Sequence, residues 1–213
     1  MNAGPDFTLD PQTVHAQNML TADNRTLKNV RGRINNVGTA FKNYRGALGT
    51  RAFGQSGRFY FEVVVYFFIK RQLRNDLIFE VALSRKTEID KNYTVDGSPY
   101  AWTVCARRCP LCRTVCLMTF HNGVRLYHIP LTENSPPGTT LRTTVGFLID
   151  TKTRQWFIVD AKNRRLFFRF KNIDTSKPLW PVFGAYSTEY VSVSLALRTG
   201  KDVQAVPDIP SDI

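Results

Sequence analysis

The four cysteines of the chain lie close together, at a spacing that could bind a metal or exchange electrons. They follow the pattern Cys-x3-Cys-x2-Cys-x3-Cys between residues 105 and 116. Cysteines two to four residues apart are common ligands of structural zinc, and a Cys-x2-Cys pair also has the spacing of redox-active thiols. The residues concerned are Cys105, Cys109, Cys112 and Cys116.

A regular hairpin through this segment argues against a zinc site. If the chain turns between Pro110 and Leu111, the outer two cysteines face each other and so do the inner two. The two pairs are then about 13 Å apart along a strand, whereas zinc needs every sulfur at about 2.3 Å. We therefore expect packed thiols and no cofactor. An irregular loop that binds zinc, with His121 or His128 replacing one cysteine, and a disulfide across the inner pair remain alternatives. Strand-like residues after Cys112 disfavour a redox site, which normally opens a helix.

The other ionisable residues do not form a recognisable catalytic set. No histidine lies in a nucleophile motif, and the acidic residues within predicted strands are isolated from one another. The fragment is therefore predicted not to be an enzyme. The residues considered are the histidines His15, His121 and His128 and the acids Glu62, Glu80 and Asp150.

The chain is strongly basic, with 29 Lys and Arg against 17 Asp and Glu, a net charge of +12 and a pI near 9.8. Such a field attracts RNA, acidic peptides or anionic lipid, but it also solubilises a surface that has no specific partner. No glycine-rich phosphate loop or RNA-reading aromatic motif accompanies these charges. The basic clusters comprise Arg25, Lys28, Arg31 and Arg33; Lys70, Arg71 and Arg74; Arg107, Arg108 and Arg113; and Arg164, Arg165, Arg169 and Lys171.

Short apolar segments between Gly, Asn, Pro and Asp residues predict the elements that would position these side chains. Residues 56–65 run from a polar turn into aromatic and β-branched residues, which predicts a strand buried on at least one face. About a dozen strands are expected along the chain, and Asn122-Gly123 is typical of a tight hairpin turn. The pattern predicts an all-β protein, a bent antiparallel two-sheet β-sandwich, with at most a short N-terminal helical turn near residues 12–20.

The 213 residues are expected to form one domain over residues 7–199, with a flexible end at 1–6 and a flexible tail at 200–213. No stretch approaches the about 18 apolar residues of a membrane-spanning helix. The first residues do not resemble a secretory signal, and there are only four cysteines. These features favour a cytoplasmic location.

Four motifs, in order along the chain, resemble those of PRY-SPRY domains. Residues 7–15 (FTLDPQTVH) are similar to the opening PRY motif, and residues 56–63 (SGRFYFEV) to the first core strand of SPRY domains. Residues 145–150 (VGFLID) and 179–184 (LWPVFG) are similar to a later strand and to the closing motif. The resemblance covers roughly residues 7–197.

This resemblance implies a bent β-sandwich with a PRY-like part at about 7–50 and a SPRY-like part at about 51–199. Such domains bind target proteins through loops at one end. They also close many tripartite-motif (TRIM) E3 ubiquitin ligases, in which a RING domain supplies catalysis and the PRY-SPRY domain selects the substrate. The basic segment at residues 70–76 and the cysteine segment depart from the family pattern.

The resemblance also implies a partner site near the strand that begins at Tyr100 and near the closing segment. Trp102 falls on a core position, whereas Arg107 and Tyr186 are expected at the surface, in a basic pocket suited to an acidic or phosphorylated protein target. Arg107→Ala and Tyr186→Ala are expected to abolish partner capture without unfolding the domain. RNA binding on the same fold is the alternative, and the fragment is expected to be a monomer. The predicted partner-binding residues are Arg71, Arg74, Tyr93, Tyr100, Cys105, Arg107, Arg108 and Tyr186.

Overall fold

The computed structural model describes residues 6–32, 40–54, 57–203 and 206, and within them the chain is built of strands. Helical structure in this part of the chain is limited to two 3₁₀ turns, η1 (Lys86–Glu88) and η2 (Gly200–Asp202). The strands are β1 (Asn18–Leu20), β2 (Thr26–Asn29), β3 (Gly46–Leu48), β4 (Arg58–Ile69), β5 (Leu77–Ser84), β6 (Ala101–Arg108), β7 (Val115–His121), β8 (Val124–Pro130), β9 (Thr140–Asp150), β10 (Gln155–Asp160), β11 (Arg165–Lys171), β12 (Trp180–Ala185) and β13 (Val191–Arg198).

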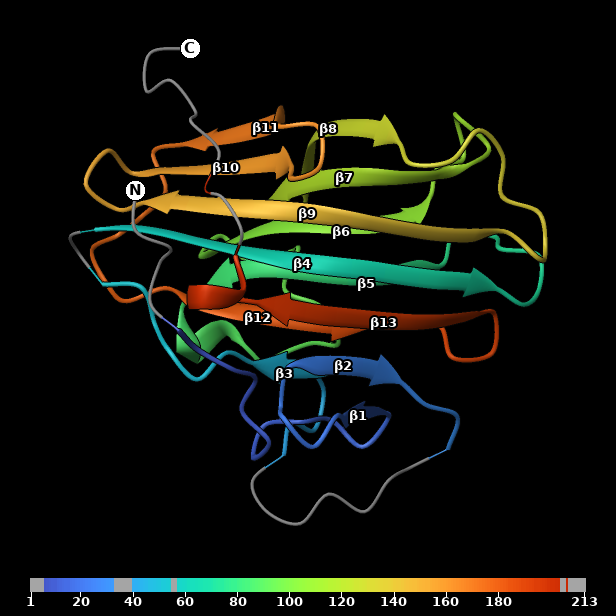
Figure 1. The fold of residues 1–213 in the computed structure, drawn as a ribbon, viewed down its shortest axis with the longest axis horizontal. Coiled ribbons are helices and arrows are strands. Elements are labelled where there is room, and N and C mark those ends of the chain that lie inside the picture. Colours follow the sequence, from blue (N-terminus) through green and yellow to red (C-terminus); the bar gives the residue numbers. More distant parts are fainter. Residues whose placement is uncertain (1–5, 33–39, 55–56, 204–205, 207–213) are drawn as a thin grey trace.

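These strands form two antiparallel sheets that pack face to face (Figure 1). One sheet has seven strands in the order β1-β2-β13-β4-β9-β10-β11, and the other has six in the order β3-β12-β5-β6-β7-β8. The all-β sandwich predicted from the sequence is confirmed. The N-terminal region adds strands to both sheets, because β2 pairs with β13 while β3 pairs with β12.

The long strand β4 shows how the sequence builds the core. Alternate side chains along it, such as Phe61 and Phe67, are fully buried between the sheets, as expected for a strand whose residues point to opposite faces in turn. Phe61 stacks on Phe147 of β9 at a ring-centroid distance of 5.0 Å, and meets Phe183 of β12 edge-on at 6.0 Å. The second contact joins the two sheets.

The N-terminal helical turn considered for residues 12–20 does not form. Residues 11–13 make a hydrogen-bonded turn and Asn18–Leu20 is strand β1. The Asn18 side chain is fully buried and donates a hydrogen bond to the carbonyl oxygen of Ala185, at 2.9 Å. A long-range contact of this kind outweighs the weak local helical preference.

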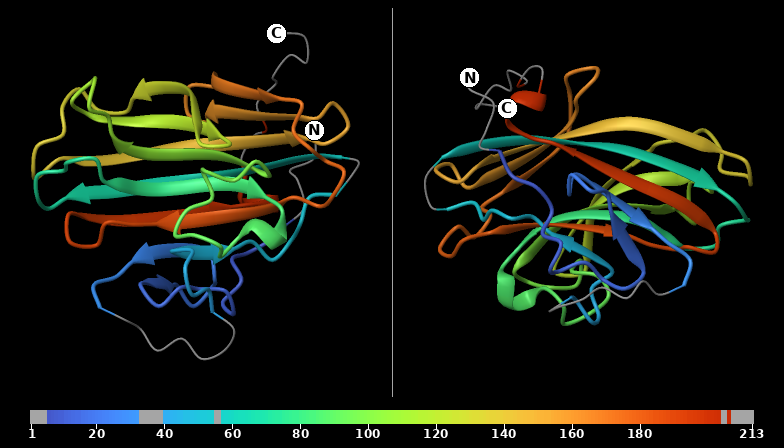
Figure 2. Two further views of the ribbon diagram at one scale, coloured as in Figure 1. Left: turned by 180° about the vertical axis from the view of Figure 1, so that it is seen from behind. Right: turned by 60° about the horizontal axis from the view of Figure 1, so that its bottom comes forward.

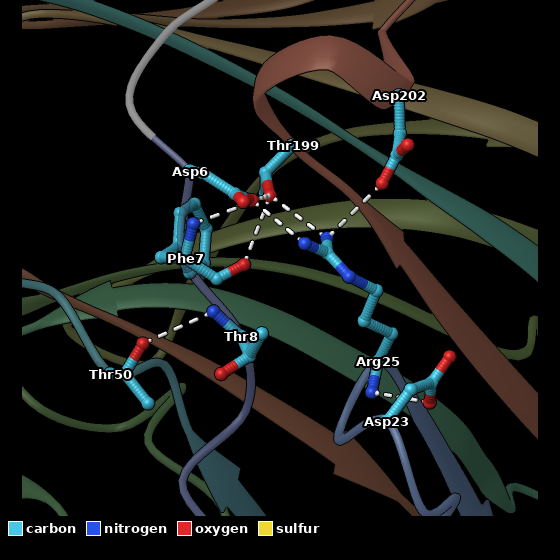
Figure 3. A network of polar contacts seen from close by, with 8 residues as sticks. All are labelled: Asp6, Phe7, Thr8, Asp23, Arg25, Thr50, Thr199 and Asp202. Carbon is cyan, nitrogen blue, oxygen red and sulfur yellow. Dashed lines mark hydrogen bonds and ion pairs between the residues drawn. The ribbon is translucent and has the colours of Figure 1, made fainter.

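Side chains from the two ends of the described domain interlock beside β2 (Figure 3). The buried Thr199 hydroxyl donates to the Asp6 carboxylate at 2.6 Å and accepts a hydrogen bond from the Phe7 N–H at 3.3 Å. Arg25 forms ion pairs with Asp6 at 2.8 Å and with Asp202 at 3.4 Å. The hydrogen bonds from Thr199 and Arg25 lower the pKa of Asp6 below its usual value.

Residues 200–203, which are expected in the flexible tail, are part of the folded domain. Gly200–Asp202 form η2, and Val203 is buried against the outer face of the seven-stranded sheet beside Tyr60 and Leu148. The loose ends expected at residues 1–5 and 207–213 lie outside the described residues. No helix in the described part of the chain has the length and apolar character needed to cross a membrane.

The segment between β5 and β6, residues 85–100, lies across the outer face of the six-stranded sheet (Figure 2, left). Ile89 and Val95 of this segment are buried against Ala82 of β5 and Ala101 of β6. The segment therefore covers one part of this face and forms a wall beside the rest.

Candidate functional site

The outer face of β5, β6, β7 and β8, here called the β5–β8 face, carries most of the polar and sulfur-bearing side chains that the sequence singles out. Inward-facing residues such as Val104 and Leu117 join the core, so their neighbours along the strands point outward. Strand register places Glu80, Cys105, Met118 and His128 side by side in one row across this face, and Arg107, Cys116 and Pro130 in the next row.

Glu80 is a fully buried carboxylic acid beneath residues 85–100. It accepts hydrogen bonds from the hydroxyl of Tyr186 at 3.2 Å and from the N–H of Val95 at 3.3 Å. Burial, together with the nearby charge of Asp96, raises the pKa of Glu80 to about 8. The side chain is therefore mostly protonated at neutral pH, which avoids the large cost of an unpaired buried charge.

Tyr186 is not at the surface, so that expectation is wrong. Only 2% of its surface is exposed, because its ring passes beneath Tyr93 and its hydroxyl reaches Glu80. Gly184 makes room for it, since a Cβ on that glycine would lie 2.4 Å from the Tyr186 hydroxyl oxygen. The Tyr93 ring, in contrast, is 58% exposed and meets Tyr186 edge-on at 6.3 Å.

Cys105 is also unavailable to a folded partner, because it is fully buried. Burial raises the pKa of its thiol to about 12, so the side chain remains a neutral thiol. Arg107, two residues further along β6, lies over this cysteine and forms an ion pair with Asp96 at 3.0 Å. Its guanidinium carbon lies 5.0 Å from the centre of the Phe120 ring.

Next to Arg107 the face is hollowed into a groove of about 370 Å³, here called the basic groove. Met118 and Phe120 form its apolar floor, and Arg125 of β8 stands opposite Arg107. Arg125 is exposed and has no acidic partner among the residues that the structure describes. Arg125 is not among the residues predicted from the sequence, although its place just after the Asn122-Gly123 turn could have indicated an exposed strand position. The groove is lined by Asn75, Arg107, Pro110, Met118, Phe120 and Arg125.

Two further predicted arginines lie near this groove. Arg108 donates a hydrogen bond to the carbonyl oxygen of Arg74 at 3.3 Å, which ties the end of β6 to the loop after β4. Arg74 itself is exposed in that loop, one residue from Asn75 of the groove. Of the predicted residues, Arg74 and Arg108 are thus in direct contact.

The remaining predicted residues lie elsewhere. Arg71 is exposed at the start of the same loop, where its N–H donates to the carbonyl of Tyr190 at 3.2 Å. Tyr100 precedes β6 and packs beneath the guanidinium group of Arg85, 4.0 Å from the ring centre. Seven residues of extended chain, roughly 23 Å, separate it from Arg107.

Tyr93 borders a second hollow, of about 660 Å³, on the other side of residues 85–100. Three basic residues, Lys42, Arg45 and Lys91, contribute to its lining together with Phe41. This hollow is more polar than the basic groove. The exposed Tyr93 side chain belongs to its edge and not to the groove.

The cysteine segment forms a hairpin with a different register from the one expected. Arg107, and not Cys105, pairs with Cys116, because the turn extends over residues 109–114. Arg113 adopts a left-handed conformation there (φ 58°), and its N–H donates to the carbonyl of Cys109 at 2.8 Å. The four thiols are therefore not arranged as two facing pairs, and none of them forms a disulfide bond.

The histidines occupy distinct environments. His121 stacks on Trp102 at 5.0 Å, and its Nδ1 lies 2.9 Å from the carbonyl oxygen of Ala101. A ring nitrogen of His128 and the sulfurs of Cys109 and Cys112 lie within 4.8 Å of one another. The buried position expected for Trp102 is confirmed, since 4% of it is exposed.

Comparisons with known proteins identify the architecture. No family model matches the chain, and no curated protein matches it. Among solved structures, the TRIM65 PSpry domain is similar with a TM-score of 0.64 and 18% sequence identity, and the match covers 90% of each chain. Stonustoxin is similar with a TM-score of 0.64 and 16% identity over 89% of this chain and 28% of the stonustoxin chain. The chain thus has the PRY-SPRY fold that its sequence motifs indicated.

Proposed function

We propose that this chain is a protein-recognition domain that binds an acidic or phosphorylated segment of a partner in the basic groove. The observation that carries the proposal is the pair of guanidinium groups, Arg107 and Arg125, on either side of an apolar floor. Asp96 holds Arg107 in place, whereas Arg125 is exposed and has no acidic partner among the described residues. A carboxylate or phosphate would supply that partner.

The apolar floor of the groove would make binding selective for the residue next to the acidic one. Met118 and Phe120 offer a polarisable thioether and an aromatic ring, which favour an apolar side chain next to the acidic one. A cavity of about 370 Å³ suits a few side chains of an extended segment better than a whole folded surface. The preferred ligand is therefore an acidic residue beside an apolar or aromatic residue.

On the same proposal, the partner is a substrate that this domain recruits for a tripartite-motif E3 ubiquitin ligase. The support is the shared fold with the TRIM65 PSpry domain, together with the sequence motifs. Catalysis would then belong to another domain of the ligase, and this domain would supply only the choice of substrate.

RNA remains the alternative ligand because the chain carries a net charge of +12. The basic clusters lie on separate elements, and Arg25 is already neutralised by Asp6 and Asp202. An RNA-binding surface usually forms a continuous basic track along the backbone. The arrangement therefore favours a local acidic ligand over a nucleic acid.

The first prediction concerns Arg125. Peptides selected by the purified domain from a display library of random short sequences should be enriched in Asp or Glu beside apolar residues. Arg125→Glu should weaken their binding about tenfold or more, because a charge-assisted contact is replaced by repulsion, and fluorescence anisotropy would measure the loss. Arg142→Glu is the matched control, since Arg142 is exposed on the outer face of the other sheet.

Two outcomes would contradict the proposal. One is equal peptide binding by the Arg125→Glu and Arg142→Glu variants. The other is a domain that selects no acidic peptide but binds random-sequence RNA with an affinity that falls steeply with salt. Phosphorylated and unphosphorylated versions of a selected peptide would show whether phosphate or carboxylate is preferred.

A further inference from the structure

Three thiols and an imidazole come together where the β6–β7 turn meets β8, outside the basic groove. The sulfurs of Cys109 and Cys112 and a ring nitrogen of His128 all lie within 4.8 Å of one another. The Cys116 side chain packs in one cluster with Cys109 and Cys112. Donor atoms of these kinds are the ligands that zinc prefers in proteins.

The strand register brings His128 to this cluster. His128 of β8 pairs with Met118 of β7, so the two side chains point to the same face. Cys116 lies two positions before Met118 and therefore points to that face as well. The imidazole is thus the diagonal cross-strand neighbour of Cys116, at the side of β7 away from β6.

The turn before β7 holds Cys109 and Cys112 in place. It is closed by a hydrogen bond from the Cys109 N–H to the Thr114 carbonyl at 2.7 Å, and the Arg113 N–H donates to the Cys109 carbonyl at 2.8 Å. These two backbone bonds fix the turn that carries both cysteines.

Cys105 does not belong to this set. It lies in the middle of β6, in the row that joins Glu80 to Met118, four residues before Cys109. Its neighbours are Arg107 and Glu80, and it is fully buried. A regular hairpin separates Cys105 from the turn, but His128 lies near the turn and can take the place of Cys105 in the alternative that the sequence left open.

We propose that Cys109, Cys112, Cys116 and His128 bind one Zn²⁺ as a structural site. Zinc–sulfur bonds of about 2.3 Å and zinc–nitrogen bonds of about 2.0 Å in a tetrahedron separate the ligand atoms by roughly 3.5–3.8 Å. The donor atoms of Cys109, Cys112 and His128 lie within 4.8 Å of one another, and a shift of about 1 Å would bring these three to that separation.

The surroundings suit a closed structural site. Cys109 and Cys116 are buried and Cys112 is half-buried, so four protein ligands would fill the coordination sphere and leave no open position for catalysis. Three thiolates and a neutral imidazole around Zn²⁺ carry one net negative charge.

The test is metal content together with cobalt substitution of the full chain, purified under reducing conditions. We expect one equivalent of zinc, and a Co²⁺-loaded protein with the visible bands of a tetrahedral site and an intense near-ultraviolet thiolate charge-transfer band. Cys112→Ser and His128→Ala should lose zinc, and Cys112→Ser should weaken the charge-transfer band. Cys105→Ala is the matched control and should keep both zinc and band.

A second measurement uses the unmodified chain, so it remains informative if the variants fail to fold. Removal of zinc from the unmodified chain with a chelator should lower the melting temperature, and added zinc should restore it. The proposal is overturned if the reduced chain holds no zinc and shows no charge-transfer band with Co²⁺. It is also overturned if Cys105→Ala loses the metal while Cys112→Ser keeps it. Protein that binds zinc only after reduction of a Cys109–Cys112 disulfide would support the site.

Discussion

Glu80 is the residue whose chemistry depends most on the tertiary fold. In the unfolded chain its carboxyl group has an ordinary pKa of 4.5, whereas burial raises the pKa to about 8 in the folded domain. Between these two pH values the folded state holds a proton that the unfolded state has released. Since stability falls with rising pH wherever the native state binds more protons, Glu80 should destabilise the domain progressively from about pH 4.5 to about pH 8.

Glu80→Gln tests this loss of stability, because glutamine keeps the shape of the glutamate side chain and cannot ionise. Its oxygen can still accept from Tyr186 or Val95, and its amide can donate to the hydroxyl of the neighbouring buried Tyr44. We expect the variant to gain stability relative to the unmodified domain as pH rises through the window, by on the order of a few kcal/mol.

Urea denaturation near pH 4.5 and above pH 8 would measure the difference in the free energy of unfolding. Glu133→Gln makes the same change at an exposed position and is the control. If both variants show the same pH dependence as the unmodified domain, Glu80 is not protonated in the folded state, and the account of its environment is wrong.

Individual residues also show which positions could be predicted from the sequence and which could not. Trp102 was correctly placed in the core from its motif position, but Tyr186 was misplaced because only the fold brings Glu80 and Tyr93 around it. Nothing near Tyr186 in the sequence indicates those partners. Arg125 was missed for the same reason, since it becomes significant only opposite Arg107.

At the scale of elements, the local pattern of apolar residues predicts the strands but does not predict the loops. β4 and β5 could be predicted because aromatic and β-branched residues fill them. The cysteine hairpin was predicted with its turn one residue too early, because the left-handed Arg113 and the bond from its N–H to Cys109 set the turn at residues 109–114. A shift of one residue in the turn moves every cross-strand pair by two.

Within residues 85–100, the carboxylate of Asp90 makes a cluster of hydrogen bonds to the N-terminal region. Its Oδ1 accepts hydrogen bonds from the backbone N–H groups of Lys42, Asn43 and Tyr44 at 3.0, 2.6 and 2.9 Å. Asp90 also has a positive φ of 73°, which aspartate and asparagine tolerate better than alanine. The contact fastens this segment to the N-terminal region, beside the hollow that Tyr93 borders.

Asp90→Ala should therefore lower the free energy of unfolding by about 1–3 kcal/mol, from lost charge-assisted hydrogen bonds and added backbone strain. It should also speed hydrogen exchange at the amides of residues 42–44. Asp90→Asn retains Oδ1 and should have a smaller effect on both quantities. Unchanged exchange at these three amides in Asp90→Ala would show that the carboxylate does not hold the segment.

At the scale of the whole molecule, the two outer faces of the sandwich differ. The β5–β8 face is walled by residues 85–100 and hollowed at the basic groove. The outer face of the seven-stranded sheet carries a separate hollow lined by Tyr66 and Arg142. The interlocked ends at Asp6 and Thr199 lie beside the seven-stranded sheet, near β2 and β13 (Figure 3). Partner binding at the groove would therefore leave the ends of the described domain away from the contact.

The most direct test of the binding account is site-specific photo-crosslinking in cell extract, with and without nuclease. A photoreactive residue at Asn75 would lie in the groove lining, and one at Tyr66, which is 42% exposed, would report on the opposite face. The account predicts protein crosslinks from position 75 that resist nuclease and are suppressed by Arg125→Glu and by a selected acidic peptide. Crosslinks that vanish with nuclease, or that form from position 66 and not from position 75, would contradict it.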